Sequence, residues 1–253
     1  FYIACREGHI EIVKLLLNYK SVDVNKANKN QMTPFYVACC YGYIEIMKLL
    51  LNDKRVDINK ADKNGETPFL IACGAGYIEV LKLLLNDERI DINKSYNEGV
   101  TPFYIACQNG HIKIVKLLLS DTRIDINKAD DDGWTPLYGA CQSGHIEIVK
   151  LLLSDHRVNI NKKDYNGETT LHEARENGKT RINELIKSFL NNPNETRRKL
   201  RIELGFASKP FFHFFFQCFF HFLFLKIYLD IDAASLFAIT VLLSDQFLDF
   251  KHN

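Results

Sequence analysis

The sequence lacks a surplus of charge of either sign, with 32 Lys and Arg residues against 31 Asp and Glu residues in 253. Nucleic-acid-binding domains usually carry a basic excess, so this balance gives no electrostatic reason to expect a nucleic-acid partner. The chain also lacks the motifs His-Glu-x-x-His and Gly-x-Ser-x-Gly and a Walker loop. We therefore predict a protein that is not an enzyme, with no catalytic residues, no cofactor and no metal site.

Two short stretches resemble ligand-binding motifs but lack the required context. Gly74-Ala75-Gly76 lies between two expected helices, whereas a dinucleotide-binding turn lies between a strand and a helix. Asp130-Asp131-Asp132-Gly133 lacks the spaced ligands and the closing Glu of a calcium loop. We interpret the first stretch as a helix end and the second as a solvated turn.

Repetition is what the sequence has in abundance. A Thr-Pro pair or its equivalent recurs every 34 residues, at Thr33, Thr67, Thr101, Thr135 and Thr169. A fixed period of this length is typical of a solenoid, in which each unit packs against its neighbours.

One unit, residues 101–127, shows what each repeat should form. Thr101 is suited to cap a helix N-terminus, and Pro102 fits the first helical position, where no N–H is needed. Gly110 tolerates the left-handed conformation that ends a helix. A second helix should start at Ile112, and its broad apolar stripe predicts packing on several sides.

The stretch TPFYIACQNGHIKIVKLLL, followed by DIN and a polar turn, resembles the ankyrin repeat. The resemblance covers residues 1–192 and implies an all-α solenoid of stacked helix pairs with short β-hairpin turns. The His of the family's Thr-Pro-Leu-His motif is replaced by Tyr or Leu in every copy except the sixth, which has His172. The link after the Leu run lacks the family's Gly and is one residue longer, which explains a period of 34 instead of 33.

Two residue types recur at fixed repeat positions. Neighbouring repeats are expected to lie about 8–10 Å apart, too far for disulfides, so the recurring cysteines should be reduced and buried. This favours a reducing, cytoplasmic location. The recurring cysteines are Cys5, Cys39, Cys73, Cys107 and Cys141. Histidines follow a Gly in three repeats, where two other repeats have Tyr, so we expect each imidazole to bond a backbone group and not a metal. They are His9, His111 and His145.

Both ends of the solenoid depart from the pattern. Phe1 aligns with Phe35, so the first copy is truncated and the chain is expected to be a fragment. In the sixth copy polar residues replace apolar ones on the outer face, as a terminal cap requires. These replacements are Arg175, Thr180, Asn183 and Lys187.

Three further segments are expected after the repeats. Residues 193–210 form a basic linker or helix, Phe211–Leu229 is a Phe-rich apolar segment, and residues 230–253 form an amphipathic helix. Nineteen residues are just enough to span a bilayer, and the preceding basic residues would keep the repeats on the cytoplasmic side. The apolar segment could instead pack as a helix on the last repeat, or be translated intron.

The resemblance implies a monomeric scaffold that binds a partner protein, of unknown identity, on a concave face made by turn tips and the exposed residues of first helices. These positions vary between copies whereas the core positions do not. The candidate partner-binding residues are Lys29, Asn30, Met32, Tyr41, Lys63, Asn64, Glu66, Tyr96, Asn97, Glu98, Gln108, Asn109, Asp131, Asp132, Trp134, Gln142, Ser143, Tyr165 and Asn166.

Aromatic residues dominate interface energies, so Trp134, Tyr96, Tyr165 and Tyr41 are the expected hot spots. Two alternatives remain open at this stage. The chain could be a membrane-tethered ankyrin protein, or the targeting arm of an enzyme whose catalytic domain precedes Phe1.

Overall fold

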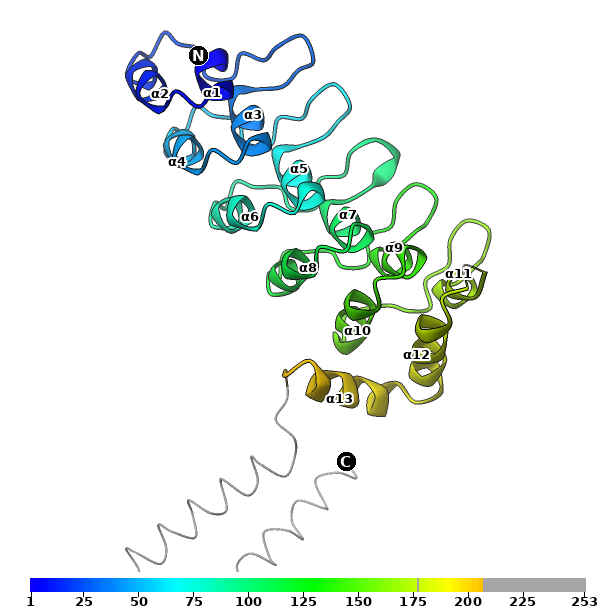
Figure 1. Cartoon of the computed structure of the whole chain (residues 1–253). Coiled ribbons are helices and arrows are strands. Elements are labelled where there is room, and N and C mark those ends of the chain that lie inside the picture. Colours follow the sequence, from blue (N-terminus) through cyan, green and yellow to red (C-terminus); the bar gives the residue numbers. More distant parts are fainter. Residues whose placement is uncertain (177, 207–253) are drawn as a thin grey trace, which may run out of the picture. The chain divides into compact units, whose positions relative to one another are not determined.

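The computed structural model describes residues 1–176 and 178–206, which are helices joined by loops (Figure 1). The chain divides into two compact units, Phe1–Arg197 and Arg198–Asn253. The first unit holds the helix pairs, and the second is described only as far as residue 206. The expected apolar segment Phe211–Leu229 and the expected helix at 230–253 lie outside the described residues.

In the part of the chain that the structure describes, the repeats form six helix pairs, followed by one further helix. The bounds are α1 Tyr2–Arg6, α2 Ile10–Leu17, α3 Pro34–Cys40, α4 Ile44–Asn52, α5 Pro68–Ala75, α6 Ile78–Leu85, α7 Pro102–Gln108, α8 Ile112–Leu119, α9 Pro136–Ser143, α10 Ile146–Ser154, α11 Thr170–Glu176, α12 Thr180–Asn191 and α13 Pro193–Glu203. A short 3-10 helix, η1, spans Asn97–Gly99. Each odd-numbered helix from α1 to α11 packs on the next odd-numbered one, and the even-numbered helices make a second row (Figure 1).

Each of four helix pairs starts as the sequence predicts. The hydroxyl of the Thr accepts a hydrogen bond from the N–H three residues later, at 3.0–3.2 Å, and Pro follows at the first helical position. The hydroxyl therefore satisfies a donor that the helix would leave without a partner. These residues are Thr33, Thr67, Thr101 and Thr135.

The expected role of the recurring histidines is confirmed for two of them. His111 Nε2 lies 2.9 Å from the carbonyl oxygen of Gly74, and His145 Nε2 lies 2.9 Å from that of Gln108. Because a carbonyl only accepts, Nε2 carries the proton in both rings. The rings lie against the helix-ending glycines of the preceding repeat: a Cβ at Gly110, where φ is +79°, would come within 2.6 Å of His145 Cε1.

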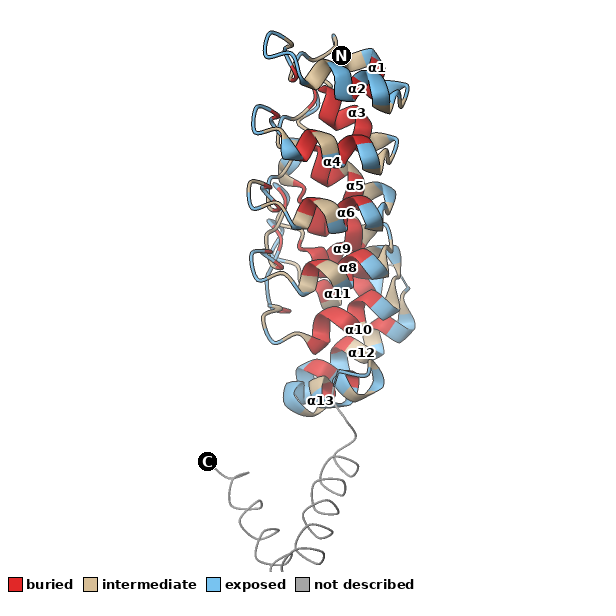
Figure 2. Ribbon diagram, turned by 90° about the vertical axis from the view of Figure 1, so that its left-hand side faces the viewer, coloured by how far each residue is buried: buried red, intermediate tan, exposed pale blue. Residues whose placement is uncertain are grey.

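The core runs through the centre of the stack (Figure 2). Phe35, Phe69 and Phe103 are fully buried in the odd row, as are Leu50 and its counterparts Leu84, Leu118 and Leu152 in the even row. The five recurring cysteines are buried and free, as predicted. Burial raises the pKa of the Cys5 thiol to about 12, and that of Cys39, Cys73 and Cys107 well above the ordinary value.

The extra residue in each link belongs to a repeating Asp-x-Arg arrangement. We call the even-numbered helices the outer helices. In each case the guanidinium bonds the Asp two residues earlier, and its Nη2 donates to a carbonyl oxygen at the end of the outer helix one repeat back. The second contact satisfies an acceptor that the helix end leaves without a partner. We call these residues the outer-loop arginines; they are Arg55, Arg89, Arg123 and Arg157, bonded to Leu17, Leu51, Leu85 and Leu119 at 2.8–3.0 Å.

A row of asparagines joins the same loops. Asn59, for example, donates from Nδ2 to the carbonyl oxygen of Arg89 at 2.6 Å and accepts at Oδ1 from the N–H of Asp91 at 2.9 Å. The counterparts Asn25, Asn93 and Asn127 repeat both bonds. One amide therefore satisfies a donor and an acceptor of the next repeat.

The sixth pair differs from the others on its outer face. Arg175, Thr180 and Lys187 are exposed there, whereas Asn183 is half-buried and its Oδ1 lacks a hydrogen-bond partner. The start of α13 lies against the end of α12: the Thr196 hydroxyl donates to the carbonyl oxygen of Ser188 at 3.1 Å.

Candidate partner-binding surface

Five turns, which we call tips one to five, project beyond the row of odd-numbered helices (Figure 1). They span residues 28–32, 62–66, 96–100, 130–134 and 164–168. Together with the exposed ends of the odd-numbered helices they make a surface that we call the tip face. It corresponds to the concave face on which the sequence places the candidate residues.

None of the candidate residues is buried. Those exposed are Lys29, Tyr41, Lys63, Asn64, Asn97, Glu98, Asn109, Asp131, Asp132, Ser143, Tyr165 and Asn166. Those half-buried are Asn30, Met32, Glu66, Tyr96, Gln108, Trp134 and Gln142. The structure therefore leaves every one of them some access to a partner.

Four of the five tips are built around one polar side chain. Asp130 Oδ1 accepts from the N–H groups of Asp132 and Trp134, at 3.1 and 2.8 Å. Asn28, Asp62 and Asp164 make the same two bonds in their own tips. Burial raises the pKa of the Asp130 carboxyl, and the two N–H groups oppose that rise. These side chains, three of them buried and Asn28 half-buried, therefore shape the tips.

Tip three is built differently because Tyr96 occupies the position of the capping Asn or Asp. Residues 97–99 form the 3-10 helix η1, and Glu98 takes a φ of +67°, in the left-handed region that non-glycine residues seldom adopt. Gln31 stands in tip one where the other four tips have Gly. That residue does have a φ of +62°, but its tip keeps both capping bonds of Asn28.

Backbone hydrogen bonds connect some of the tips to one another. Lys63 N–H donates to the carbonyl oxygen of Asn30 at 2.9 Å, which joins tips one and two. Asp131 N–H donates to that of Glu98 at 2.8 Å and Tyr165 N–H to that of Asp132 at 3.1 Å, which joins tips three, four and five. No backbone bond of the described part of the chain joins tips two and three. The expected β-hairpin turns are therefore short, with one antiparallel bridge, Lys163 to Thr169, in the described ranges.

Aromatic rings lie at both ends of the tip face. Trp134 stacks on Tyr138 with ring centroids 5.1 Å apart, and the Tyr138 hydroxyl donates to Glu173 Oε2 at 2.5 Å. Tyr165 on tip five is 79 % exposed, and Tyr41 is 58 % exposed and stacks on Tyr43. The ring of Tyr138 thus holds the Trp134 ring in place by stacking on it. The sequence analysis missed this role of Tyr138, which the four-residue spacing of the two rings could have indicated.

The formal charge of the exposed tip residues changes sign along the stack. Tips one and two present Lys29 and Lys63, whereas tips three and four present Glu98, Asp131 and Asp132. The face therefore offers opposite charges to the two ends of an elongated partner.

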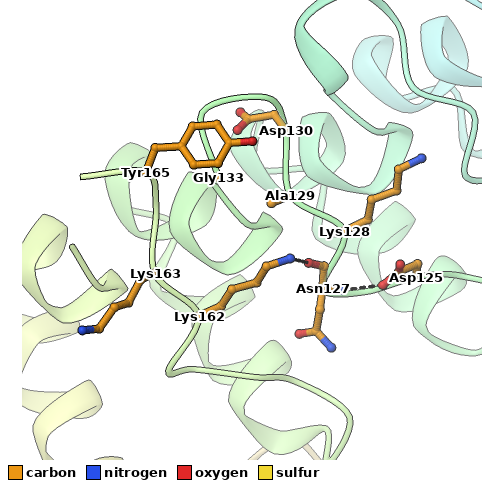
Figure 3. Close-up of a pocket in the computed structure, with 9 residues that line it drawn as sticks. All are labelled: Asp125, Asn127, Lys128, Ala129, Asp130, Gly133, Lys162, Lys163 and Tyr165. Carbon is orange, nitrogen blue, oxygen red and sulfur yellow. Dashed lines mark hydrogen bonds between the residues drawn. The ribbon is translucent and has the colours of Figure 1, made fainter. Parts of the chain in front are cut away.

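A shallow pocket of about 440 Å³ lies between the loops of the fourth and fifth tips (Figure 3). Lys162 Nζ donates to the carbonyl oxygen of Asn127 at 3.0 Å, and Lys128 Nζ to that of Asn93 at 3.0 Å. Asp130, also in its lining, caps its own tip. The polar groups of this pocket thus connect neighbouring repeats.

Within residues 1–176 and 178–206, no three or more His, Cys, Asp or Glu side chains are grouped so that they could hold a metal ion. In those ranges, no helix combines the length and the apolarity that crossing a membrane requires.

Comparisons with known proteins agree with this architecture. The family model described as ankyrin repeats (3 copies) matches residues 1–62, 54–130 and 122–198. A comparison with curated proteins gives no match.

Two solved structures are similar to this chain. The crystal structure of EF0377, an ankyrin repeat protein, is 32 % identical, with a TM-score of 0.67 over 73 % of this chain and 94 % of that one. The crystal structure of an ankyrin repeat domain from Acinetobacter baumannii AYE is 25 % identical, with a TM-score of 0.66 over 72 % and 93 % of the two chains. The repeats, their helix pairs and the match to the family model together show that the chain belongs to the ankyrin-repeat family.

Proposed function

We propose that this protein is a non-catalytic interaction module that binds a partner protein on its tip face. Ankyrin repeats generally mediate protein–protein interaction, and this solenoid offers a continuous surface on which all the candidate residues are accessible. The observation that carries the proposal is the set of aromatic side chains held on that surface, above all Trp134 and Tyr165.

These two rings have the properties of interface anchors. An aromatic ring buries a large apolar area at a small cost in conformational entropy, and such rings dominate measured binding energies. Trp134 is already positioned by Tyr138, so a partner need not order it. Tyr165 is 79 % exposed on a tip that is hydrogen-bonded to tip four.

The buried free cysteines support a reducing, cytoplasmic location for this interaction, because a disulfide-forming compartment would put such thiols at risk.

The test uses a partner protein that has first been identified by cross-linking to the full chain and then purified. Trp134→Ala should weaken its binding at least tenfold, the loss typical of an interface hot spot. Tyr165→Ala should act in the same direction with little effect on stability, because its ring is exposed. Tyr19→Ala is the matched control, since this ring is 55 % exposed but lies in the outer loop after α2.

Unchanged affinity in both tip variants, measured by calorimetry on folded protein, would reject the tip face as the binding surface. A loss of affinity equal to theirs in Tyr19→Ala would do the same.

A further inference from the structure

The aromatic part of the tip face is bordered by charge of one sign. Trp134 and Tyr165 lie on tips four and five, and the exposed carboxylates of Glu98, Asp131 and Asp132 lie on tips three and four. Backbone bonds connect these three tips, so the rings and the carboxylates belong to one continuous surface.

These carboxylates differ from most other acidic groups of the solenoid, which are already paired. On the outer helices Glu45 pairs with Lys48 at 2.7 Å and Glu79 with Lys82 at 2.7 Å. The Asp residues of the outer loops bond the outer-loop arginines, and Asp130 bonds the N–H groups of its own tip. No ion pair or side-chain hydrogen bond in the described residues involves Glu98, Asp131 or Asp132.

Three lysines, Lys128, Lys162 and Lys163, lie on the loops that lead to tips four and five, outside the tips themselves. Lys128 and Lys162 donate to the carbonyls of Asn93 and Asn127. Lys163 extends away from the Tyr165 ring (Figure 3). Within tips three to five themselves, the exposed charged side chains are therefore the three carboxylates.

We infer that tips three to five form a docking surface for an extended, arginine-containing segment of a partner protein. A guanidinium stacks favourably on an aromatic ring and bonds a carboxylate through two parallel N–H groups, so one side chain type satisfies both features of the surface. Lys29 and Lys63 repel such a segment from tips one and two, which fixes where along the stack it binds.

The repeat spacing sets the spacing of the arginines. Neighbouring repeats lie about 10 Å apart, and an extended chain advances about 3.3 Å per residue. One arginine at every third position therefore places successive guanidinium groups over successive tips, and a segment of about seven residues spans all three.

This inference rests on the proposed function and names the class of partner. The probe is a fluorescein-labelled nine-residue peptide with arginine at positions two, five and eight among Gly and Ser, titrated onto the full chain at about 0.05 M salt. We expect saturable binding that weakens as salt is raised, because the interaction involves exposed charges. Glu98→Gln, Asp131→Asn and Asp132→Asn combined should weaken binding roughly tenfold, since each exposed pair contributes modestly.

The matched control removes the same number of charges elsewhere, with Glu11→Gln, Glu45→Gln and Glu79→Gln on the outer helices; it should leave peptide affinity unchanged. A citrulline peptide, which keeps the shape but not the charge, should bind at least tenfold more weakly. Equal loss in the tip and control variants would overturn the inference and indicate non-specific attraction. Tighter binding of a peptide with Glu in place of Arg would also overturn it. Either result would leave the proposed function standing if the cross-linked partner still loses affinity with Tyr165→Ala.

Discussion

Arg89 shows how much one side chain contributes to the solenoid. Its guanidinium bonds Asp87 at 2.6 Å within its own loop, and it donates to the carbonyl oxygens of Leu51 and Val56 in the preceding repeat at 2.9 and 3.3 Å. Its side chain is only 29 % exposed, so these bonds are partly shielded from water. This is unlike the exposed Glu–Lys pairs on the outer helices, which solvent screens.

Replacing Arg89 by Ala should therefore lower the free energy of unfolding by about 1.5–3 kcal/mol, the usual cost of leaving charged and polar groups without partners. The urea midpoint of the full chain measures this. Lys82→Ala is the control, because it removes only an exposed pair and should change stability by less than about 0.5 kcal/mol. If the two variants unfold at the same urea concentration, the bonds to the preceding repeat contribute nothing.

At the residue scale, the sequence predicts the role of a side chain well where that role depends only on residues next to it in the chain. The capping role of Thr101 and the left-handed Gly110 were predictable because both depend on adjacent residues. The contacts of the outer-loop arginines were not, because each joins residues 38 positions apart: the Asp-x-Arg pattern recurs in the sequence, but the helix end that each Arg bonds does not follow from it.

At the element scale, tip three is the exception among the tips. Its first residue, Tyr96, has no acceptor for the N–H groups of Glu98 and Val100, and the loop responds with a short 3-10 helix. The sequence predicts every tip as a polar turn, and it does not reveal which one rearranges. Losing the capping side chain at Tyr96 changes its turn more than losing the Gly at Gln31 changes tip one, because in tip one Asn28 still accepts two hydrogen bonds.

Tyr96→Asp should restore this cap and stabilise the protein by about 0.5–1.5 kcal/mol, the net worth of a hydrogen bond or two. Amide hydrogen exchange at Val100 should slow in the same variant. Tyr96→Ala separates the cap from simple loss of the ring and should show neither effect. If the Asp and Ala variants exchange at equal rates at Val100, the side chain at this position does not control the turn.

At the scale of the whole molecule, paired charges recur in every link and their effects should add. The arginine hydrogen bonds lower the pKa of Asp53, Asp87 and Asp121 below the ordinary value. A carboxyl with a depressed pKa in the folded state stabilises the fold above its unfolded pKa of about 4 and loses that contribution as pH falls further. Burial raises the pKa of Asp130 and Glu66, so their contribution has the opposite sign.

We therefore expect urea midpoints to fall between about pH 4 and pH 2.5. They should fall less in Asp87→Asn, because the Asn amide does not titrate in either the folded or the unfolded state. Asp130→Asn should instead remove a contribution that favours the fold at low pH. An equal acid dependence in Asp87→Asn and the parent chain would show that the paired Asp does not set acid stability.

The architecture as a whole was the most predictable part, because six copies of one pattern report the same fold independently. The tip face was predictable as a region for the same reason. The distribution of charge and backbone bonds across it depends on contacts between copies, such as the bond from Asp131 to Glu98, and these require the structure.

The outer-loop arginines also give the fold a direction. Each completes the end of a helix that was synthesised 38 residues earlier, as Arg89 does for Leu51. During translation, a newly made outer helix therefore has an incomplete C-terminus until the ribosome has delivered the next link. For α2, α4, α6 and α8, the last hydrogen bond of the helix end therefore forms one repeat after the helix itself has been made.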